Sequence, residues 1–406
     1  MSDIVFVIVR GTDAPEVYGG EKSSIATAVA MRRLGHNPSF VTTADDAFTD
    51  ELAAAGLSYT VVPVGDPFSG FGASGLVGRA RRLADMARIS AAVFNRARGR
   101  ARSSGDGGAI VHTAAIPGFV TGWLGGLLAR APVIFHVRTA SMKQKVRHRE
   151  EVAMLLARRT ITVSGSLRDQ LLTTGWRFTR RLVGNRVQAI YNGFDFSEMD
   201  AAIAAEPASA ARAAVGPDPG RPSALLVGAV FRDKGQLAFI ERVLPAVVAR
   251  VPALHVTFAG GIKDPAYHRA CLDAIARLGL ARNVDFVGYQ PKARLYRHYR
   301  AADFLILPSE REGLPRCVVE GHAFALPVVA TAVVGTVEAA RDQETGFLVP
   351  LERLEDMIDP IVRLATDAAL RERMGAAGAA HVRCTFDLAE NVRAIAAVYR
   401  ELAPKV

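Results

Sequence analysis

Two glutamates, Glu312 and Glu320, have seven residues between them in the segment EREGLPRCVVEGHAFALPVVA. Glu312 lies in a polar loop after the short apolar run 304–307, which is expected to be a strand. Glu320 lies about a turn and a half into a helix that begins near Pro315. The free N–H groups and the dipole at a helix N-terminus attract an anion such as a diphosphate. A carboxylate one turn further can accept two hydrogen bonds from a ribose diol. This pair could therefore hold both ends of a sugar nucleotide.

The simpler interpretation of two such glutamates is solvated surface charge, because Glu is mostly exposed. The flanking residues favour the site, because EGLPRCVVEGHAFALPVVA resembles the E-x7-E segment of the family-4 retaining glycosyltransferases of the GT-B fold. The departures are local. Gly321-His322 replaces the usual small residue and Met, and Ala325 replaces a frequent Gly.

The resemblance implies an α/β protein with two Rossmann-like, doubly wound domains that face an interdomain cleft. We expect an acceptor-binding domain over residues 1–195, a nucleotide-sugar-binding domain over 196–384, and a crossover helix over 385–406 that packs on the first domain. Length and patterning agree: 406 residues suit two domains, and the first 64 residues read strand–helix–strand–helix–strand. Residues 198–222, rich in Ala, Pro and Gly, are expected to be a linker.

The segment GAVFRDKGQ in the second domain resembles the family's G-R-L-x-x-x-K-G signature. Lys234 matches the lysine that contacts the diphosphate, whereas the family's arginine is Ala229 here. Arg232, three residues further on, is the candidate to replace it.

The family's other donor contacts also map onto this domain. Gly313 and Leu314, at the helix start, are expected to contact the donor. Glu320 is expected to hold the ribose, and Glu312 is the expected catalytic residue that orients the donor sugar.

The first domain offers a second set of candidates. YGGEKSSIATAVAMRRLGH resembles the family's first loop and helix, so Gly20 is expected to approach the donor, and Gly19 to contact acceptor or phosphate. His136, in VIFHVRT, matches the catalytic-site histidine beside the transferred sugar. Arg138 and His112, the latter in HTAAIPG, are candidate acceptor or phosphate contacts. The alternatives without a binding role are a tight turn at Gly19-Gly20 and histidines that are hydrogen-bonded within the protein.

Other patterns exclude competing chemistries. The stretch 70–75 fits G-x-G-x-x-G but follows the third strand of its domain, and lacks the acidic residue of a dinucleotide site. The three cysteines are scattered, and Asp-x-Asp does not occur. We therefore expect no metal, no bound cofactor and metal-independent transfer.

The net charge of +10 is concentrated in the first half. Residues 1–200 hold 25 Lys/Arg against 17 Asp/Glu, and residues 201–406 hold 25 against 23. A basic face, especially Arg79–Arg102, indicates contact with an anionic membrane or a phosphorylated acceptor; an arginine-rich surface without a partner explains it equally well. Nucleic acid is not expected.

No signal peptide is expected, and 109–129, with four glycines, indicates strand and helix and not a membrane span. We expect a cytoplasmic protein with peripheral contact at the inner membrane face.

The expected function is transfer of a sugar from a nucleotide-diphosphate sugar to a carbohydrate or glycolipid acceptor, in cell-surface polysaccharide, lipopolysaccharide or glycolipid synthesis. Two alternatives stay open. One is a sugar-nucleotide epimerase or phosphorylase on the same fold. The other is a nucleotide-sugar-binding protein without turnover, which the loss of arginine at Ala229 supports.

Overall fold

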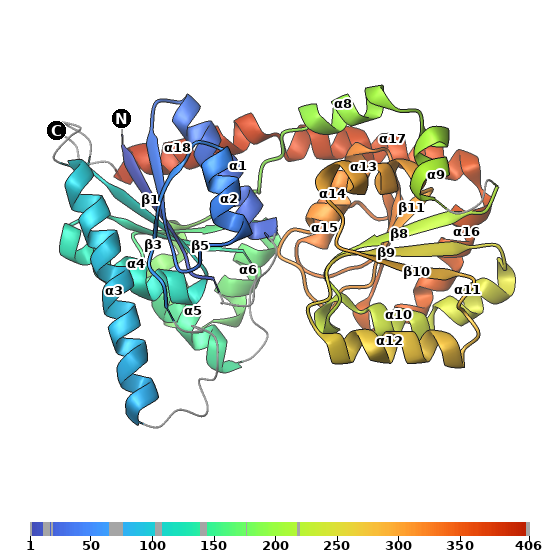
Figure 1. The fold of residues 1–406 in the computed structure, drawn as a ribbon, viewed down its shortest axis with the longest axis horizontal. Coiled ribbons are helices and arrows are strands. Elements are labelled where there is room, and N and C mark those ends of the chain that lie inside the picture. The colour runs from blue at the N-terminus through green and yellow to red at the C-terminus, as the bar shows by residue number, and fades with distance from the viewer. Residues whose placement is uncertain are drawn as a thin grey trace. The chain divides into compact units, whose positions relative to one another are not determined.

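A computed structural model describes residues 2–10, 17, 19–64, 76–101, 108–138, 144–175, 177–216 and 220–402 (Figure 1). The glycine pattern at 70–75 lies outside these residues. The chain divides into two compact units, here called unit 1 (Met1–Phe194 with Leu388–Val406) and unit 2 (Asp195–Asp387).

Unit 1 is a seven-stranded parallel sheet in the order β3-β2-β1-β4-β5-β6-β7. Its strands are β1 (Asp3–Ile8), β2 (Asn37–Thr42), β3 (Ser58–Val61), β4 (Ile110–Ala114), β5 (Val133–Val137), β6 (Arg159–Thr162) and β7 (Val187–Ala189). Its helices are α1 (Gly19–Arg33), α2 (Ala47–Ala54), α3 (Leu76–Ala101), α4 (Ala115–Ala129), α5 (Gln144–Leu156), α6 (Gly165–Thr174), α7 (Arg177–Val183), the short η1 (Gly184–Arg186) and the C-terminal α18 (Leu388–Leu402).

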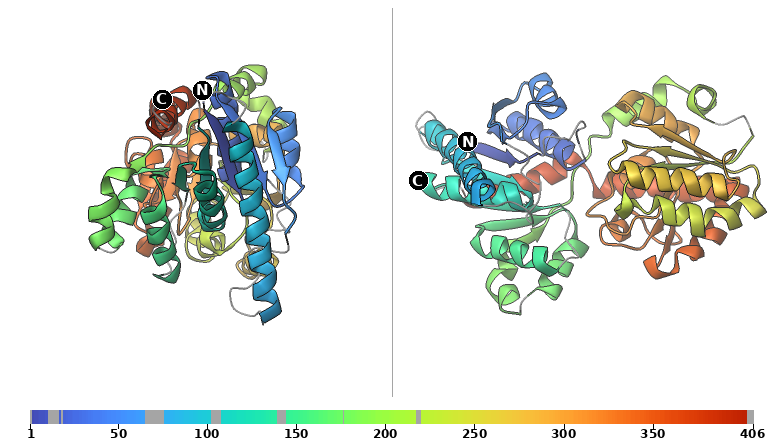
Figure 2. Two further views of the ribbon diagram at one scale, coloured as in Figure 1. Left: turned by 90° about the vertical axis from the view of Figure 1, so that its left-hand side faces the viewer. Right: turned by 60° about the horizontal axis from the view of Figure 1, so that its bottom comes forward.

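The two faces of this sheet are covered differently. Side chains such as Phe6 and Ile134 pack under α1, α2 and α18 in one apolar cluster. On the other face, α4 comes very close to the strands because buried glycines replace its side chains: a Cβ on Gly122 would lie 2.5 Å from Thr113, and one on Gly126 2.6 Å from Val133. Figure 2 shows α3 next to α4, with one end of α3 extending beyond the sheet. The stretch 109–129, with its four glycines, thus forms β4 and α4, as expected.

Unit 2 is a six-stranded parallel sheet in the order β10-β9-β8-β11-β12-β13. Its strands are β8 (Ser223–Val227), β9 (His255–Ala259), β10 (Val284–Gly288), β11 (Phe304–Leu307), β12 (Val328–Thr331) and β13 (Gly346–Val349). Its helices are α8 (Ser197–Ala205), α9 (Ala208–Val215), η2 (Arg232–Lys234), α10 (Gln236–Arg242), α11 (Leu244–Arg250), α12 (Pro265–Arg277), α13 (Lys292–Ala301), α14 (Arg316–Ala323), α15 (Thr336–Ala339), η3 (Leu351–Met357), α16 (Ile358–Thr366) and α17 (Ala368–Thr385).

The expectation of a linker over 198–222 is wrong. The segment forms α8 and α9, both of which contact α13. Arg212 of α9 fixes this packing, because its Nη2 donates to Asp303 Oδ2 at 2.9 Å.

The expected pair of Rossmann-like parallel-sheet domains is confirmed. In each unit the strand order reverses at the first strand: β1 lies between β2 and β4, and β8 lies between β9 and β11. Open sheets of this kind bind ligands beyond the carboxyl ends of the strands at that reversal. The segments that follow β1, β4, β8 and β11 are therefore the places where a site is expected. None of the helices in the described parts of the chain is long and apolar enough to cross a membrane.

Candidate functional site

The loops that follow β8 and β11 meet in unit 2 through an ion pair between two predicted site residues. Lys234 ends η2, and its Nζ donates a hydrogen bond to Glu312 Oε1 at 2.6 Å. The next residue, Gly235, has a φ of +70°, and a Cβ there would lie 2.0 Å from the carbonyl oxygen of Pro308. Only glycine fits that position without strain. The Lys-Gly pair thus reflects the close approach of the two loops.

This ion pair sets the charge of Lys234. Burial by itself lowers the pKa of an ammonium group. The negative charge of Glu312 and its hydrogen bond outweigh that effect, so the pKa of Lys234 is raised. On α14, burial, followed by the charge of Glu312, raises the pKa of the Cys317 thiol to about 12. Lys234 is therefore a cation that an anionic ligand can use, and Cys317 is not a thiolate nucleophile.

Two further contacts join η2 to the loop after β11. Arg311 pairs with Asp233, and the backbone N–H of Glu310 donates to the carbonyl of Asp233 at 2.9 Å. Arg232 begins the same short helix, and its side chain is exposed. Its guanidinium makes no hydrogen bond or ion pair with any residue that the structure describes.

Glu320 lies on α14 with its carboxylate held from two sides. Tyr299 Oη donates to Oε2 at 3.1 Å, and Arg316 Nη2 donates to Oε1 at 3.1 Å. Tyr299 is fully buried, and burial, followed by the charge of Glu320, raises its pKa well above the ordinary value. The phenol therefore stays protonated and donates. A carboxylate has about four lone-pair sites, so Glu320 retains capacity for a ribose diol.

Gly313 and Leu314, both buried, precede α14. Pro315 is the N-cap of this helix, which begins at Arg316, whereas the sequence predicted Pro315 as the first helical residue. Gly321 packs on β11, because a Cβ there would lie 2.0 Å from Leu305 Cδ1. This contact, near the C-terminal end of the eight-residue helix, holds α14 against the sheet. The free N–H groups at its N-terminus follow Glu312 in the chain and can serve as a backbone anion site.

In unit 1, α1 begins at Gly19-Gly20, and Arg138 lies against this start. A Cβ on Gly20 would come 3.0 Å from Arg138 Cδ. Arg138 Nη2 donates to Ser24 Oγ at 2.9 Å, and Nη1 donates to Asn192 Oδ1 at 3.2 Å. The structure therefore brings the predicted glycine pair and Arg138 together, and Gly20 and Arg138 line one cavity.

His112 and His136 are neighbours on β4 and β5, and both are buried. His112 Nε2 lies 3.0 Å from His136 Nδ1, and His112 Nδ1 lies 2.6 Å from the hydroxyl of Tyr399 on α18. Burial, followed by the charge of Arg138, lowers the pKa of His112 to about 3. The same two causes lower the pKa of His136 well below its ordinary value. Both rings are neutral at physiological pH.

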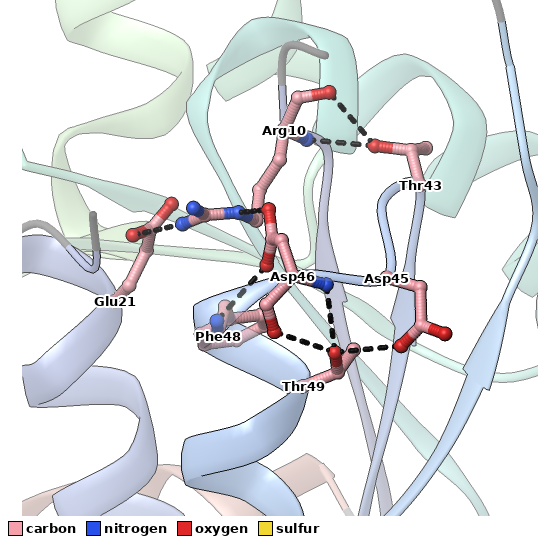
Figure 3. A network of polar contacts seen from close by, with 7 residues as sticks. All are labelled: Arg10, Glu21, Thr43, Asp45, Asp46, Phe48 and Thr49. Atoms are coloured by element: carbon pink, nitrogen blue, oxygen red, sulfur yellow. Dashed lines mark hydrogen bonds and ion pairs between the residues drawn. The ribbon is translucent and has the colours of Figure 1, made fainter. Parts of the chain in front are cut away.

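A buried arginine, Arg10, lies between two carboxylates at the same edge of unit 1 (Figure 3). Its Nε donates to Asp46 Oδ2 at 2.8 Å, and its guanidinium also pairs with Glu21 of α1. Asp46 is in addition the N-cap of α2 and accepts from the N–H of Phe48 at 2.9 Å. The Arg10 side chain is 1 % exposed. It ties the chain after β1 to the first turn of α1, where Glu21 lines the cavity beside Gly20.

The predicted residues thus form one cluster in each unit. The unit 1 cluster consists of Gly19, Gly20, His112, His136 and Arg138; the unit 2 cluster consists of Arg232, Lys234, Glu312, Gly313, Leu314 and Glu320. No group of three or more metal-binding side chains suited to an ion occurs in the described ranges. The unit 2 cluster can bind an anion and a diol, and the unit 1 cluster offers neutral imidazoles and an arginine.

Sequence reasoning missed the side chains that hold these residues, including Tyr299, Ser24, Asn192 and Tyr399. Most contacts join distant segments: 287 residues separate Tyr399 from His112. Arg316 alone carried a local signal, because it lies four residues before Glu320 on one helix.

The chain has two doubly wound parallel sheets, and in each the candidate residues follow the strands at which the strand order reverses. This arrangement is typical of the GT-B fold, and solved structures agree. The Anabaena protein Alr3699/HepE, solved in complex with UDP and glucose, superposes with a TM-score of 0.79 at 19 % identity, covering 99 % of this chain and 100 % of that one. A glycosyltransferase from Rickettsia africae gives a TM-score of 0.78 at 19 % identity, covering 99 % and 98 %. Likeness at this identity shows the fold alone.

Family comparisons are more specific. The model described as "Glycosyl transferase 4-like domain" matches residues 19–193, and the model described as "Glycosyl transferases group 1" matches residues 221–367. The D-inositol 3-phosphate glycosyltransferase of Nocardia farcinica is 34 % identical over 177 residues, 43 % of this chain and 39 % of that protein. The lipopolysaccharide core biosynthesis mannosyltransferase LpsB of Rhizobium meliloti is 30 % identical over 196 residues, 47 % and 55 % respectively. The matches span less than two thirds of either relative. The chain belongs to the group 1 glycosyltransferases.

Proposed function

We propose that this chain is a retaining glycosyltransferase that transfers a sugar from a nucleotide-diphosphate sugar to a hydroxyl of a carbohydrate or glycolipid, in cell-surface polysaccharide, lipopolysaccharide or glycolipid synthesis. The observation that carries the proposal is the unit 2 cluster. It places the Lys234 cation and the N-terminus of α14 at the reversal of the sheet, with Glu320 further along that helix. A solved neighbour that holds UDP and glucose supports a nucleotide-sugar donor. Retention rests on membership of the family.

Departure of the nucleoside diphosphate leaves negative charge on the phosphates and positive charge on the sugar. Lys234 and the N–H groups of α14 would stabilise the leaving group. Glu320 would accept from the ribose hydroxyls. Glu312 and His136 would contact the donor sugar, the former to orient it.

The remaining predicted residues have supporting roles in this proposal. Gly20 offers close backbone approach and a helix N-terminus to the donor phosphate. Gly19 and Arg138 would contact acceptor or phosphate. His112, whose two ring nitrogens lie within hydrogen-bond distance of Tyr399 and His136, would act on the ligand through His136. Chemistry of this kind needs no metal ion, because the cation and the helix supply the positive charge.

Ala229 removes a cation that the family's signature supplies beside Lys234. We propose that Arg232 takes its place, because its guanidinium is exposed and has no ion pair among the described residues. Arg232→Ala should then cut transfer, and Ala229→Arg in that background should partly restore it. Diphosphate affinity and rate within error of the parent chain would contradict this role.

The function is tested by incubating the protein with UDP-, GDP- and ADP-sugars, with and without lipid extract. Transfer to acceptor supports the proposal. Epimerised or phosphorolysed sugar without acceptor would favour the first alternative enzyme class. A thermal shift with nucleotides but no turnover would favour a binding protein, since a ligand of the native state raises apparent stability.

We further propose peripheral contact with an anionic bilayer through the face built by α3, α4, α5 and α7. In unit 1, α4 contacts α3 and α5, and α5 contacts α7. These helices expose large apolar side chains, including Leu83, Leu127, Leu128, Leu156 and Leu182. Exposed arginines lie on the same helices or at their ends, including Arg88, Arg98, Arg130, Arg158 and Arg180. Apolar side chains beside basic ones suit a membrane interface.

Sedimentation with vesicles of phosphatidylglycerol and phosphatidylcholine tests this contact. Binding should occur at low salt, fade as screening rises, and weaken in the double variant Leu127→Ser/Leu128→Ser. Equal sedimentation with pure phosphatidylcholine would rule out the electrostatic part.

A further inference from the structure

A row of three hydrogen-bonded side chains links the last helix of unit 1 to β5. Tyr399 Oη lies 2.6 Å from His112 Nδ1, and His112 Nε2 lies 3.0 Å from His136 Nδ1. Tyr399 is fully buried, and the two histidines are 2 % and 3 % exposed. Figure 1 shows α18, which carries the tyrosine, beside α1. At the end of the row, His136 Nε2 is buried and has no hydrogen-bond partner among the described residues.

The row runs along one face of the sheet. Phe6, His112 and Ile134 are paired across β1, β4 and β5. Two residues nearer the carboxyl ends of the strands, Ala114 pairs with His136, so His112 and His136 share this face. His136 is thus the member closest to the edge at which such sheets bind ligands.

The protons that the three side chains carry determine which atom donates in each hydrogen bond. Burial, followed by the charge of Arg138, lowers the pKa of both imidazoles, so each ring is neutral and carries one N–H. Burial raises the pKa of Tyr399, so its O–H is retained. If Tyr399 accepted a hydrogen bond from His112, its own O–H would be buried without an acceptor among the described residues, which is costly. Tyr399 therefore donates.

We propose that Tyr399, acting through His112, holds His136 in the tautomer that carries its proton on Nε2. Tyr399 O–H donates to His112 Nδ1, which places the His112 proton on Nε2. His112 Nε2–H then donates to His136 Nδ1, and this leaves the His136 proton on Nε2. Tyr399 and His112 are positioning residues, and His136 is the group they present.

The consequence is a definite role for His136. A neutral ring with its proton on Nε2 donates a hydrogen bond from that atom and cannot accept a proton there, so His136 is not a general base. Its partner must offer a lone pair. Resting on the proposed function, we identify that partner as a hydroxyl or phosphoryl oxygen of the nucleotide sugar.

The tautomer can be read directly by nitrogen-15 NMR of the whole chain labelled on its nine histidines, because protonated and unprotonated ring nitrogens resonate at different positions. His136→Gln identifies the signals of that ring. We expect the protons of both His112 and His136 on Nε2. A proton on His136 Nδ1 would overturn the inference, and this result needs no variant that alters the fold.

Tyr399→Phe tests the origin of the preference, with Tyr59→Phe, on β3 of the same sheet, as matched control. The first variant should turn His136 into a mixture of tautomers and lower kcat/KM for transfer about five- to tenfold, the size of one net hydrogen bond. The control should change neither. An unchanged His136 spectrum in folded Tyr399→Phe would refute the role of the tyrosine.

These outcomes separate the two proposals. A proton on Nε2 in a chain that transfers no sugar would support the row while the proposed function failed. A proton on Nδ1 in an active transferase would do the reverse.

Discussion

Neutralising Glu312 is expected to tighten nucleotide binding while it slows transfer. In the structure Lys234 Nζ gives a hydrogen bond to Glu312 Oε1 at 2.6 Å, and the Glu312 side chain is 9 % exposed. An arriving diphosphate competes for this ammonium and is repelled by the carboxylate. A hydrogen bond to a charged group contributes about 1.5–3 kcal/mol. If about half of that is lost on binding, Glu312→Gln should lower the Kd of a nucleoside diphosphate roughly tenfold, since 1.4 kcal/mol is a factor of ten.

Calorimetric titration of the parent chain and Glu312→Gln with UDP, GDP and ADP measures this change. Glu355→Gln is the matched control: it also removes one carboxylate from unit 2, but Glu355 pairs with Arg242 on the surface and is 50 % exposed. The control should leave the Kd unchanged. Transfer by Glu312→Gln should fall, because the residue proposed to orient the sugar loses its charge. Unchanged or weaker binding in a folded Glu312→Gln would refute the competition between carboxylate and diphosphate.

Three further changes test other parts of unit 2. Glu320→Ala should weaken nucleoside diphosphate binding by about 1.5–3 kcal/mol, because the ribose loses a charged acceptor; unaltered calorimetric affinity would contradict that contact. Ala325 has a φ of +58°, which explains the family's frequent glycine there, so Ala325→Gly should raise the free energy of unfolding in urea by about 1 kcal/mol; a loss would disprove strain at this residue. Burial is the main cause that lowers the pKa of His322 to about 4, below the unfolded value, so its contribution to stability is present above pH 6.5 and is lost as pH falls toward 4. Between pH 7 and 5 that loss is about 2 kcal/mol, and in His322→Met the decline should be smaller by that amount.

The fold was predictable where local pattern and burial agree. The run 304–307 indicated a strand, because strands of a parallel sheet are buried on both faces and read as continuous apolar segments, and β11 has these bounds. The linker expected over 198–222 was wrong for the opposite reason. Its prolines and glycines, in the middle and at the C-terminal end, indicated a linker, whereas its many alanines favour helix. That these helices pack against α13 depends on tertiary contacts that composition does not show.

The residues of the candidate site likewise fall into those that local sequence indicates and those that only tertiary contacts reveal. Lys234-Gly235 and the two glutamates could be found from sequence, because each lies in a short contiguous motif: Gly235 has a positive φ at the end of its own loop, and Glu312 precedes a helix start. The side chains that fix their charge and direction could not, because they arrive from other strands and helices. Tyr299 on α13 is an example, since nothing in its own segment indicates that its hydroxyl meets Glu320.

Most cations near the unit 2 cluster are already paired with carboxylates. Lys234, Arg311 and Arg316 each already pair with a carboxylate, so a diphosphate that used any of them would have to disturb an existing ion pair. Recruiting Arg232 disturbs none among the described residues, because its guanidinium is exposed and unengaged there. A chain with Ala229 in place of the family's arginine can therefore keep a second cation for the leaving group without rearranging its pairs. On this reasoning Lys234 must be released from Glu312 as the donor binds, whereas Arg232 needs only to turn toward it.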